Sequence, residues 1–373
     1  MQASDIALFI DPFSYRNEQD RLFDAKGPAD AGDHAFEPFA YLRTWLQTRG
    51  IEVHTADRLD SSSHNGRPVT IFLSFGQRAR YRRLETRDDV LLSGFFAFEC
   101  PVVLPALYDE LPQIGDKFSR VFSFSTEEAL RPFMRRQVPL TRFMLPQSFD
   151  EVHKKIWEGR DRRFLVMVSG NKLTTLRINE LYTERLRALE FFNRYGEIDL
   201  YGRDWEGPPV RMASRTPRVV HRLERRARTR WESLRPPTDP LRVAVRETYR
   251  GSTSHKAETL GGYTFAVCYE NQILEGWITE KIFDCLYAGT VPIYWGAPDI
   301  ERWVPPECFI DMRQFGGYEE LREFLHSLTP EQIDSYRVAA RDFIGSEDFL
   351  PFSKQTFAEL IGRIVEEDTG VSL

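Results

Sequence analysis

Residues 263–296 constrain the fold of this chain more than any other segment. An apolar run over residues 263–269 ends at a polar loop, and a second apolar run covers residues 291–295. Between the two runs, Thr279 is a favourable helix N-cap and Gly289 a favourable residue just beyond a helix C-terminus. The segment therefore predicts a strand, a polar loop, a short helix and a second strand, which is the local pattern of an α/β sheet.

The polar residues of this segment gather where a nucleotide would bind. Glu270 and Asn271 follow the first strand, and Glu280 and Lys281 lie in the first turn of the helix. In open α/β sheets, ligands bind outside the carboxyl ends of the strands, and the free N–H groups of a helix N-terminus suit a phosphate. The alternative is that Glu280 and Lys281 are ordinary capping and surface residues.

Length and composition indicate a globular protein of two domains. At 373 residues the chain is too long for one ordinary core. A hydrophobic content of 42% and a charged content of 28% are globular values. The net charge of −6 gives no reason to expect a nucleic-acid partner. The four cysteines are far apart with no CxxC, so we expect reduced, buried cysteines.

Strands alternate with helical stretches along both halves of the chain, which favours parallel α/β sheets. We expect a first domain over residues 1–150, a second over 151–350 and a C-terminal helix within 351–373. The expected strands cover residues 6–10, 51–54, 69–75, 91–98, 121–124, 164–168 and 198–202, and the expected helices cover residues 36–46, about 175–195 and 352–367.

Several linked motifs resemble the α1,3-fucosyltransferase family. In that family a Glu-Asn pair precedes Thr-Glu-Lys, an apolar helix and Ala-Gly-x-Val-Pro. The chain has Tyr269-Glu270-Asn271, Ile278-Thr279-Glu280-Lys281 and Ala288-Gly289-Thr290-Val291-Pro292. The resemblance implies a GT-B fold, in which two Rossmann-like domains face each other across a cleft. It also implies an inverting glycosyltransferase that moves L-fucose from GDP-fucose to a hydroxyl of an N-acetylglucosamine or glucose unit, by α1,3 or α1,4 linkage.

The resemblance also assigns donor-binding roles within residues 256–281. Glu280 is expected to hold the fucose or ribose hydroxyls, with Glu270 and Asn271 orienting the donor or the loop that holds it. Trp277 stands where the family often has tyrosine and is expected either to stack on the donor or to be a buried core residue. Further expected donor-binding residues are Thr279 and Lys281, for the phosphates, and Lys256.

A second group of expected donor-binding residues lies in residues 168–203. The stretch Val168-Ser169-Gly170-Asn171 resembles the family's Val-Ser-x-Cys/Asn loop, which precedes an arginine that contacts the donor phosphates. Arg177, expected at the start of the following helix, is the candidate, because a guanidinium can fork two hydrogen bonds onto phosphate. Its alternative is a surface arginine. Tyr201 and Gly202 end the next strand, in a motif that resembles the family's Tyr-Gly-Arg-Cys but has Asp204 where cysteine is common.

Glu99 is the candidate for the general base. It follows a run of aromatic residues at the end of an expected strand, and a carboxylate in apolar surroundings has a raised pKa that suits proton abstraction. Phe98-Glu99-Cys100-Pro101 resembles the family's Phe-Glu-Ser-Pro, whose glutamate is the proposed base. The alternative is a structural carboxylate paired with an arginine.

No metal and no cofactor beyond the donor are expected. The chain has no Asp-x-Asp, and its seven histidines are scattered. Since a leaving nucleotide needs either a divalent metal or fixed cations, we expect basic side chains to carry the phosphates. The acceptor is expected to be an oligosaccharide or a lipid-linked glycan.

Residues 211–230 hold eight arginines and one acid, and we interpret residues 211–235 as an insertion. Such a segment is either a solvated basic helix or a patch for an anionic partner such as a membrane surface. The N-terminus lacks the features of a signal peptide, so we expect a cytoplasmic protein, either free or peripheral to the inner membrane. Two rival functions stay open, namely transfer from another sugar nucleotide such as a galactosyl donor, and non-catalytic binding of a glycan or lipid surface.

Overall fold

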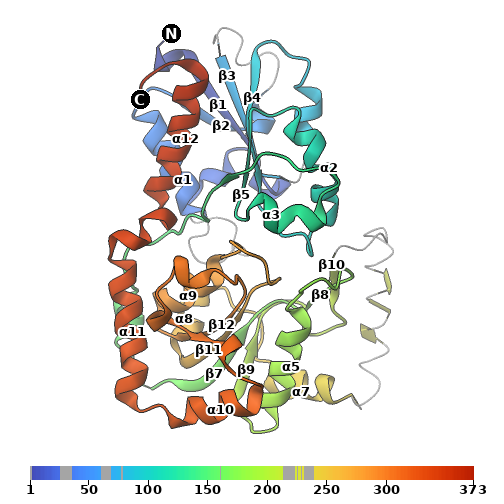
Figure 1. The fold of residues 1–373 in the computed structure, drawn as a ribbon, viewed down its shortest axis with the longest axis vertical. Helices are drawn as coiled ribbons and strands as arrows, with labels where there is room; N and C mark the ends of the chain where they lie inside the picture. The colour runs from blue at the N-terminus through green and yellow to red at the C-terminus, as the bar shows by residue number, and fades with distance from the viewer. Residues whose placement is uncertain are drawn as a thin grey trace. The chain divides into compact units, whose positions relative to one another are not determined.

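The computed structural model describes residues 2–25, 36–59, 69–76, 79–159, 161–212, 223–224, 226–227, 229–230 and 239–373. The chain divides into two compact units (Figure 1). Unit 1 comprises residues 1–150 and 349–373, and unit 2 comprises residues 151–348. Each unit is built on a parallel sheet, which confirms the predicted α/β class. Among the described residues, no helix combines the length and the apolar character needed to cross a membrane.

Unit 1 contains a six-stranded parallel sheet in the order β2-β1-β3-β4-β5-β6. Because the chain passes from β1 to β2 on one side and then to β3 on the other, the strand order reverses between β1 and β3. The strands are β1 (Ile6–Asp11), β2 (Glu52–Thr55), β3 (Val69–Ser74), β4 (Val90–Ala97), β5 (Arg120–Ser123) and β6 (Thr141–Arg142).

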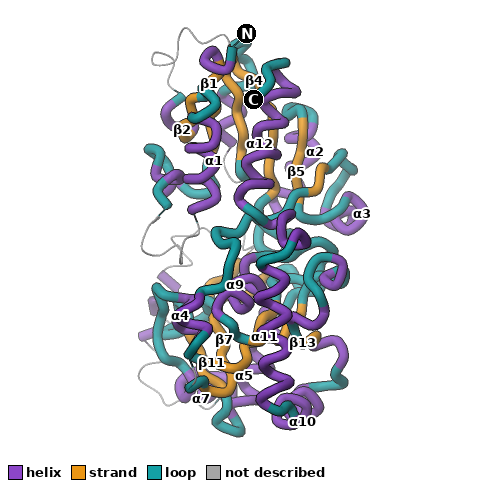
Figure 2. Tube along the Cα trace, turned by 90° about the vertical axis from the view of Figure 1, so that its left-hand side faces the viewer, coloured by secondary structure: helices purple, strands orange, loops and turns teal. Residues whose placement is uncertain are grey.

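The last helix of the chain belongs to unit 1 and packs along its first helix (Figure 2). Ring centroids of Phe39 and Phe357 lie 5.5 Å apart in an edge contact, and Lys354 donates to Glu37 at 2.8 Å. The buried residues of the last helix recur at the helical spacing that its apolar pattern predicts. The helices of unit 1 are α1 (Glu37–Gln47), α2 (Pro105–Gly115), α3 (Glu127–Leu130) and α12 (Lys354–Thr369).

Unit 2 contains a five-stranded parallel sheet in the order β13-β12-β11-β7-β9 and a separate two-stranded pair, β8 with β10. In the larger sheet the order reverses between β7 and β11. The strands are β7 (Arg163–Val168), β8 (Lys172–Thr174), β9 (Ile198–Tyr201), β10 (Val210–Met212), β11 (Tyr263–Tyr269), β12 (Val291–Trp295) and β13 (Ile310–Asp311).

The helices of unit 2 cover its sheet and bury an apolar core that includes Leu165, Phe265 and Ile293. The predicted strand–loop–helix–strand unit of residues 263–296 is present as β11, α9 and β12. The helices are α4 (Lys154–Trp157), α5 (Tyr182–Asn193), α7 (Pro240–Thr248), α8 (Lys256–Gly261), α9 (Glu280–Ala288), α10 (Tyr318–Ser327) and α11 (Pro330–Ile344).

The helix predicted over residues 175–195 is shorter than expected, and the prediction that Arg177 begins it was wrong. The helix α5 starts at Tyr182, because the segment before it is tied to the loop after β11 instead of forming helical hydrogen bonds. The Ile273 N–H donates to the Asn179 carbonyl at 2.8 Å, and the Leu181 N–H donates to the Asn271 carbonyl at 3.1 Å.

The predicted Arg-rich insertion is described only in part. Residues 213–222, 225, 228 and 231–238 lie outside the described part of the chain. Arg211 belongs to β10, and Arg211, Arg226 and Arg230 are exposed. The prediction of an anionic partner for this segment therefore stays a prediction.

Candidate active site

The reversal of strand order between β7 and β11 marks the place where a ligand is expected in unit 2. In open α/β sheets, ligands bind in the crevice outside the carboxyl ends of the two strands at such a point. Here those ends are followed by Ser169 and Gly170 on one side and by Glu270 and Asn271 on the other. The sheet topology thus brings two separately predicted groups of residues to one edge.

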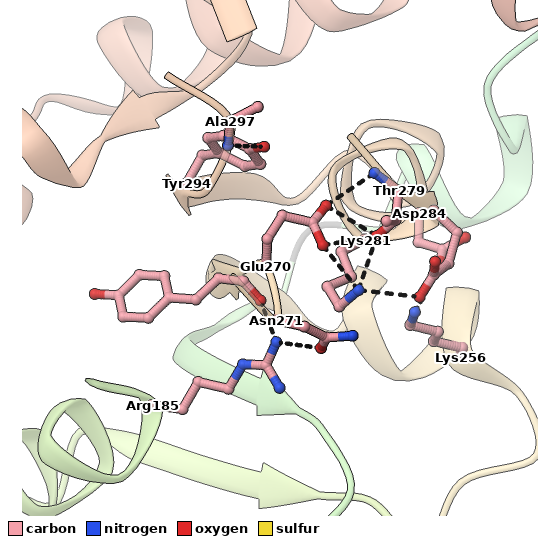
Figure 3. A network of polar contacts seen from close by, with 11 residues as sticks. Arg185, Lys256, Glu270, Asn271, Thr279, Lys281, Asp284, Tyr294 and Ala297 are labelled. Carbon is pink, nitrogen blue, oxygen red and sulfur yellow. Dashed lines mark hydrogen bonds and ion pairs between the residues drawn. The ribbon is translucent and has the colours of Figure 1, made fainter. Parts of the chain in front are cut away.

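Glu270 is the centre of the polar network at this edge (Figure 3). Its side chain is fully buried, at 0% exposure. One carboxylate oxygen, Oε1, accepts from the Thr279 N–H at 2.9 Å and from the Thr279 hydroxyl at 2.8 Å, while Oε2 accepts from Lys281 Nζ at 3.0 Å. Lys281 Nζ also donates to the Thr279 hydroxyl at 2.7 Å. Glu270 therefore holds the N-terminus of α9 at the end of β11.

Lys281 and Glu280 both carry full charges in this network. Burial by itself lowers the pKa of Lys281, but the carboxylates of Glu270 and Glu280 raise it above its ordinary value. Desolvation by itself raises the pKa of Glu280, but Lys281 and Lys256 lower it to about 2. This low pKa keeps the Glu280 carboxylate ionised at neutral pH, and 49% of the side chain is exposed.

Lys256 joins the site through an ion pair with Asp284, which links α8 to α9. Burial by itself lowers the pKa of Lys256, but Asp284 and Glu280 raise it overall. Burial raises the pKa of Asp284, while Lys256 acts in the opposite direction. Each cation of this cluster is thus held beside a carboxylate, so its position is fixed before any ligand arrives.

Arg185 completes the network, although the sequence did not single it out as a site residue. It is 7% exposed, and its Nη2 donates to the Tyr269 carbonyl at 2.6 Å and to Asn271 Oδ1 at 3.0 Å. Its guanidinium carbon lies 4.9 Å from the Tyr182 ring centroid. A signal was present, because Arg185 falls on the buried stripe of its helix that includes Ala188 and Leu189. A charged residue on a buried stripe requires a partner.

Arg177, the arginine that the sequence singled out, lies outside this network. It is exposed, and it makes no hydrogen bond or ion pair with any residue that the structure describes. Its loop nevertheless runs beside the segment after β11, where Gln272 Nε2 donates to the Ile178 carbonyl at 3.2 Å. Arg177 is therefore a neighbour of the site, and Arg185 is the arginine within it.

Ser169, Asn171, Tyr201 and Gly202 form a junction between β7 and β9. The Ser169 N–H donates to the Tyr201 carbonyl at 2.9 Å, and Asn171 Nδ2 donates to backbone carbonyls at 2.8 Å and 3.1 Å. Gly202 has a φ of 137°, and a Cβ there would lie 1.9 Å from the Ser169 carbonyl oxygen, so only glycine fits. These contacts hold the strand ends together beside Glu270 and Asn271.

Trp277 is 2% exposed and lies in the interior of unit 2. This burial fits the core alternative for Trp277 better than stacking on a donor. The loop before it is fixed by Asp299, whose carboxylate accepts from the Gly276 N–H at 2.7 Å.

Glu99 belongs to unit 1, directly after β4. It is partly buried, and its carbonyl accepts a hydrogen bond from the Tyr108 hydroxyl at 2.6 Å. In the described part of the chain, no group of three or more histidine, cysteine, aspartate or glutamate side chains could hold a metal ion.

Comparison with known proteins identifies the segment that carries the network. Residues 241–338 match the family model described as glycosyltransferase family 10 (fucosyltransferase), C-terminal. An alpha-(1,3)-fucosyltransferase of Helicobacter pylori is 34% identical over 85 residues, which are 23% of this chain and 18% of that protein. An alpha-(1,4)-fucosyltransferase of Arabidopsis thaliana is 38% identical over 71 residues, 19% and 18% of the two chains. The similarity thus spans less than a fifth of these relatives.

Solved structures show the fold over nearly the whole chain. An alpha1,3-fucosyltransferase has a TM-score of 0.50 at 14% identity, covering 97% of this chain and 90% of that one. An alpha,alpha-trehalose-phosphate synthase from Burkholderia xenovorans has a TM-score of 0.51 at 10% identity, covering 97% of this chain and 100% of that one. These similarities confirm the predicted GT-B fold class.

Proposed function

We propose that this chain, whose residues 241–338 match the C-terminal model of glycosyltransferase family 10, transfers L-fucose from GDP-fucose to a hydroxyl of an N-acetylglucosamine or glucose unit. The observation that carries the proposal is the buried network of Glu270, Thr279 and Lys281. It lies inside the matched segment, at a helix N-terminus and beside the reversal of strand order.

The donor pyrophosphate is held by Arg185, Lys281 and the first turn of α9. Arg185 uses Nη2 for its protein partners, and its Nε and Nη1 donors make no hydrogen bond to the described residues. These two nitrogens point their N–H groups in different directions, so each can donate a separate charge-assisted hydrogen bond to a phosphate oxygen. The dipole and the first N–H groups of α9 add positive potential where the leaving GDP gains negative charge.

The ionised carboxylate of Glu280 is proposed to accept hydrogen bonds from the fucose or ribose hydroxyls. It is partly exposed, and its charge is kept at neutral pH by the neighbouring Lys281 and Lys256. Lys256 acts on the donor through Glu280 and Asp284, since its ammonium is paired with Asp284.

Glu99 is proposed to be the general base. Its carboxylate removes the proton from the acceptor hydroxyl while the acceptor oxygen bonds to the anomeric carbon of fucose. The bond from that carbon to the GDP phosphate oxygen breaks with its electron pair on GDP, so attack from the opposite face inverts the configuration. Arg185 and Lys281 neutralise the departing charge, and no metal is required.

The acceptor and the cellular place of the reaction are further parts of the proposal. The relatives differ in acceptor, since they include alpha-(1,3)- and alpha-(1,4)-fucosyltransferases and a GDP-fucose protein O-fucosyltransferase 3 of Xenopus laevis, 37% identical over 70 residues. We favour an oligosaccharide or lipid-linked glycan acceptor in the cytoplasm. The Arg211–Arg230 segment would then contact an anionic membrane surface peripherally.

A donor panel tests the proposal directly. Purified protein is titrated with GDP and with UDP, and then incubated with GDP-fucose or with UDP-galactose and N-acetyllactosamine. We expect GDP to bind at least tenfold more tightly than UDP, and only GDP-fucose to give transfer product. Preference for UDP or turnover of UDP-galactose would favour the rival donor. Binding without turnover of any donor, together with salt-sensitive binding to anionic vesicles, would favour the non-catalytic rival.

A further inference from the structure

The Glu99 peptide lies outside the hydrogen-bond ladder of the unit 1 sheet. The strand β4 ends at Ala97, whose partner across the sheet is Ser123 of β5. Beyond that pair, the rings of Phe98 and Phe124 still meet, with centroids 5.5 Å apart. Glu99 then leaves the sheet, so its backbone must be fixed by contacts other than strand pairing.

A tyrosine of α2 supplies one of those contacts. Tyr108 is 1% exposed, and its hydroxyl donates to the Glu99 carbonyl at 2.6 Å. Burial, with the neighbouring Cys100 and Glu99, raises the pKa of Tyr108 well above its ordinary value, so the hydroxyl stays protonated and remains a donor. The tyrosine hydroxyl is therefore a donor at neutral pH.

Two further features hold the chain around this hydrogen bond. After Glu99, the carbonyl of Cys100 accepts from the N–H groups of Val103 and Leu104, both at 3.1 Å, which closes a turn. Before it, Gly76 has a φ of 99°, and a Cβ at Gly76 would lie 2.7 Å from the Phe96 carbonyl oxygen. The turn at Cys100 thus constrains the backbone after Glu99, the Gly76 backbone lies close to the strand before it, and Tyr108 holds the Glu99 peptide itself.

We propose that Tyr108 is a positioning residue that sets the orientation of the Glu99 carboxylate toward the acceptor hydroxyl. The inference rests on the proposed role of Glu99 as the base. A general base must lie within hydrogen-bond reach of the proton that it removes, and small misplacements of a reacting group cost large factors in rate. A buried hydroxyl whose acceptor is the base's own carbonyl fixes the base without contacting the substrate.

The test is Tyr108→Phe, which removes one oxygen and keeps the ring in the core. The matched control is Tyr81→Phe, a buried tyrosine of the same unit whose ring packs on Phe118. GDP-fucose turnover is measured with N-acetyllactosamine as acceptor and with water alone. We expect kcat to fall about tenfold for Tyr108→Phe in both assays, as expected for a misplaced base. Its KM for GDP-fucose and its affinity for GDP stay unchanged, and Tyr81→Phe behaves as wild type.

The outcomes separate this inference from the proposed function. If Glu99→Gln is inactive but still binds GDP, then a wild-type kcat in Tyr108→Phe would overturn the positioning role of Tyr108 alone. A parallel loss of thermal stability, GDP affinity and kcat in Tyr108→Phe would overturn it in favour of a structural role. Wild-type turnover of Glu99→Gln would overturn both the proposed base and the inference that depends on it.

Discussion

Lys281 lies 3.0 Å from a carboxylate oxygen of Glu270, and this ion pair joins the end of β11 to the first turn of α9. The Glu270 side chain is fully buried, whereas 22% of the Lys281 side chain is exposed. Lys281 is therefore held by a buried carboxylate, while part of its own side chain stays exposed. The pair stabilises the site before the nucleotide binds.

Neutralising Glu270 should destabilise the protein strongly. In Glu270→Gln the ammonium of Lys281 loses its buried partner, and breaking such a pair costs about 3 kcal/mol. The matched control is Glu37→Gln, which removes the partly exposed pair of Glu37 with Lys354 and should cost less than about 1 kcal/mol. Urea unfolding measures both. Equal losses in the two variants would contradict the role of Glu270.

Arg185, and not Arg177, should determine the affinity for GDP. Losing a charge-assisted hydrogen bond costs about 1.5–3 kcal/mol, so Arg185→Gln should weaken GDP binding by roughly tenfold to a hundredfold. Because Arg177 is exposed and outside the network, Arg177→Gln should change the affinity by less than about threefold. Calorimetric titration of both variants decides the question. A larger loss in Arg177→Gln would favour the arginine chosen from the sequence.

The C-terminal end of α9 should contribute to stability through two arginines. Arg162 Nη1 and Arg337 Nε both donate to the Gly289 carbonyl, at 2.8 Å and 3.1 Å, and the Arg337 guanidinium lies over the Trp157 ring. Burial and the neighbouring Arg337 lower the pKa of Arg162 to about 10, so Arg162 is charged at neutral pH. Arg337→Met should cost about 1–2 kcal/mol. An unchanged urea midpoint would refute this capping role.

Unit 1 should lose stability through His54 as the pH rises above 6.5. Its ring lies between two carboxylates, with Nδ1 2.9 Å from Asp20 and Nε2 3.1 Å from Glu52, and Arg43 also lies 3.6 Å from Asp20. The Asp20 hydrogen bond, against opposing burial, raises the pKa of His54 above 6.5. The stabilisation is therefore complete below about pH 6.5 and is lost as the pH rises through the folded-state pKa.

The Asp20–His54 pair should also lose its stabilising effect at low pH, through Asp20. Although burial opposes it, the contacts with His54 and Thr55 lower the pKa of Asp20 to about 2, so its contribution is present above about pH 4 and is lost as the pH falls toward 2. Thermal unfolding from pH 3 to 9 should show a fall in melting temperature above pH 6.5 that is absent in His54→Asn. An identical alkaline fall in this variant would exclude His54 as its source.

The sequence predicted the elements whose patterns are local. The strand–loop–helix–strand of residues 263–296 follows from apolar runs and caps, and its polar residues fall at the edge where Glu270, Thr279 and Lys281 meet. Local patterns could not predict hydrogen bonds between segments that are far apart in the sequence. The pattern of the segment before Tyr182 predicts a helix, but this segment forms backbone hydrogen bonds with the loop after β11, more than eighty residues later. Because of these long-range hydrogen bonds, the helix starts later than predicted.

The choice of arginine failed for the same reason. The sequence pattern favours Arg177, which stands at an expected helix start, and does not single out Arg185. The burial of Arg185 depends on the Tyr269 carbonyl and the Asn271 side chain, which reach it only through the folded sheet. The role of Trp277 was also open in the sequence, because stacking and core packing require the same residue type.

Acceptor-dependent release of GDP from GDP-fucose, in the presence of EDTA, tests the central claim most directly. Purified protein is incubated with GDP-fucose alone and with N-acetyllactosamine, a lipid-linked glycan or a serine-containing peptide, and wild type is compared with Lys281→Ala. We expect a glycan to accelerate GDP release severalfold over the rate with water, EDTA to leave the rate unchanged and Lys281→Ala to abolish release. Wild-type release by Lys281→Ala, or release that requires an added divalent metal, would contradict the proposed mechanism.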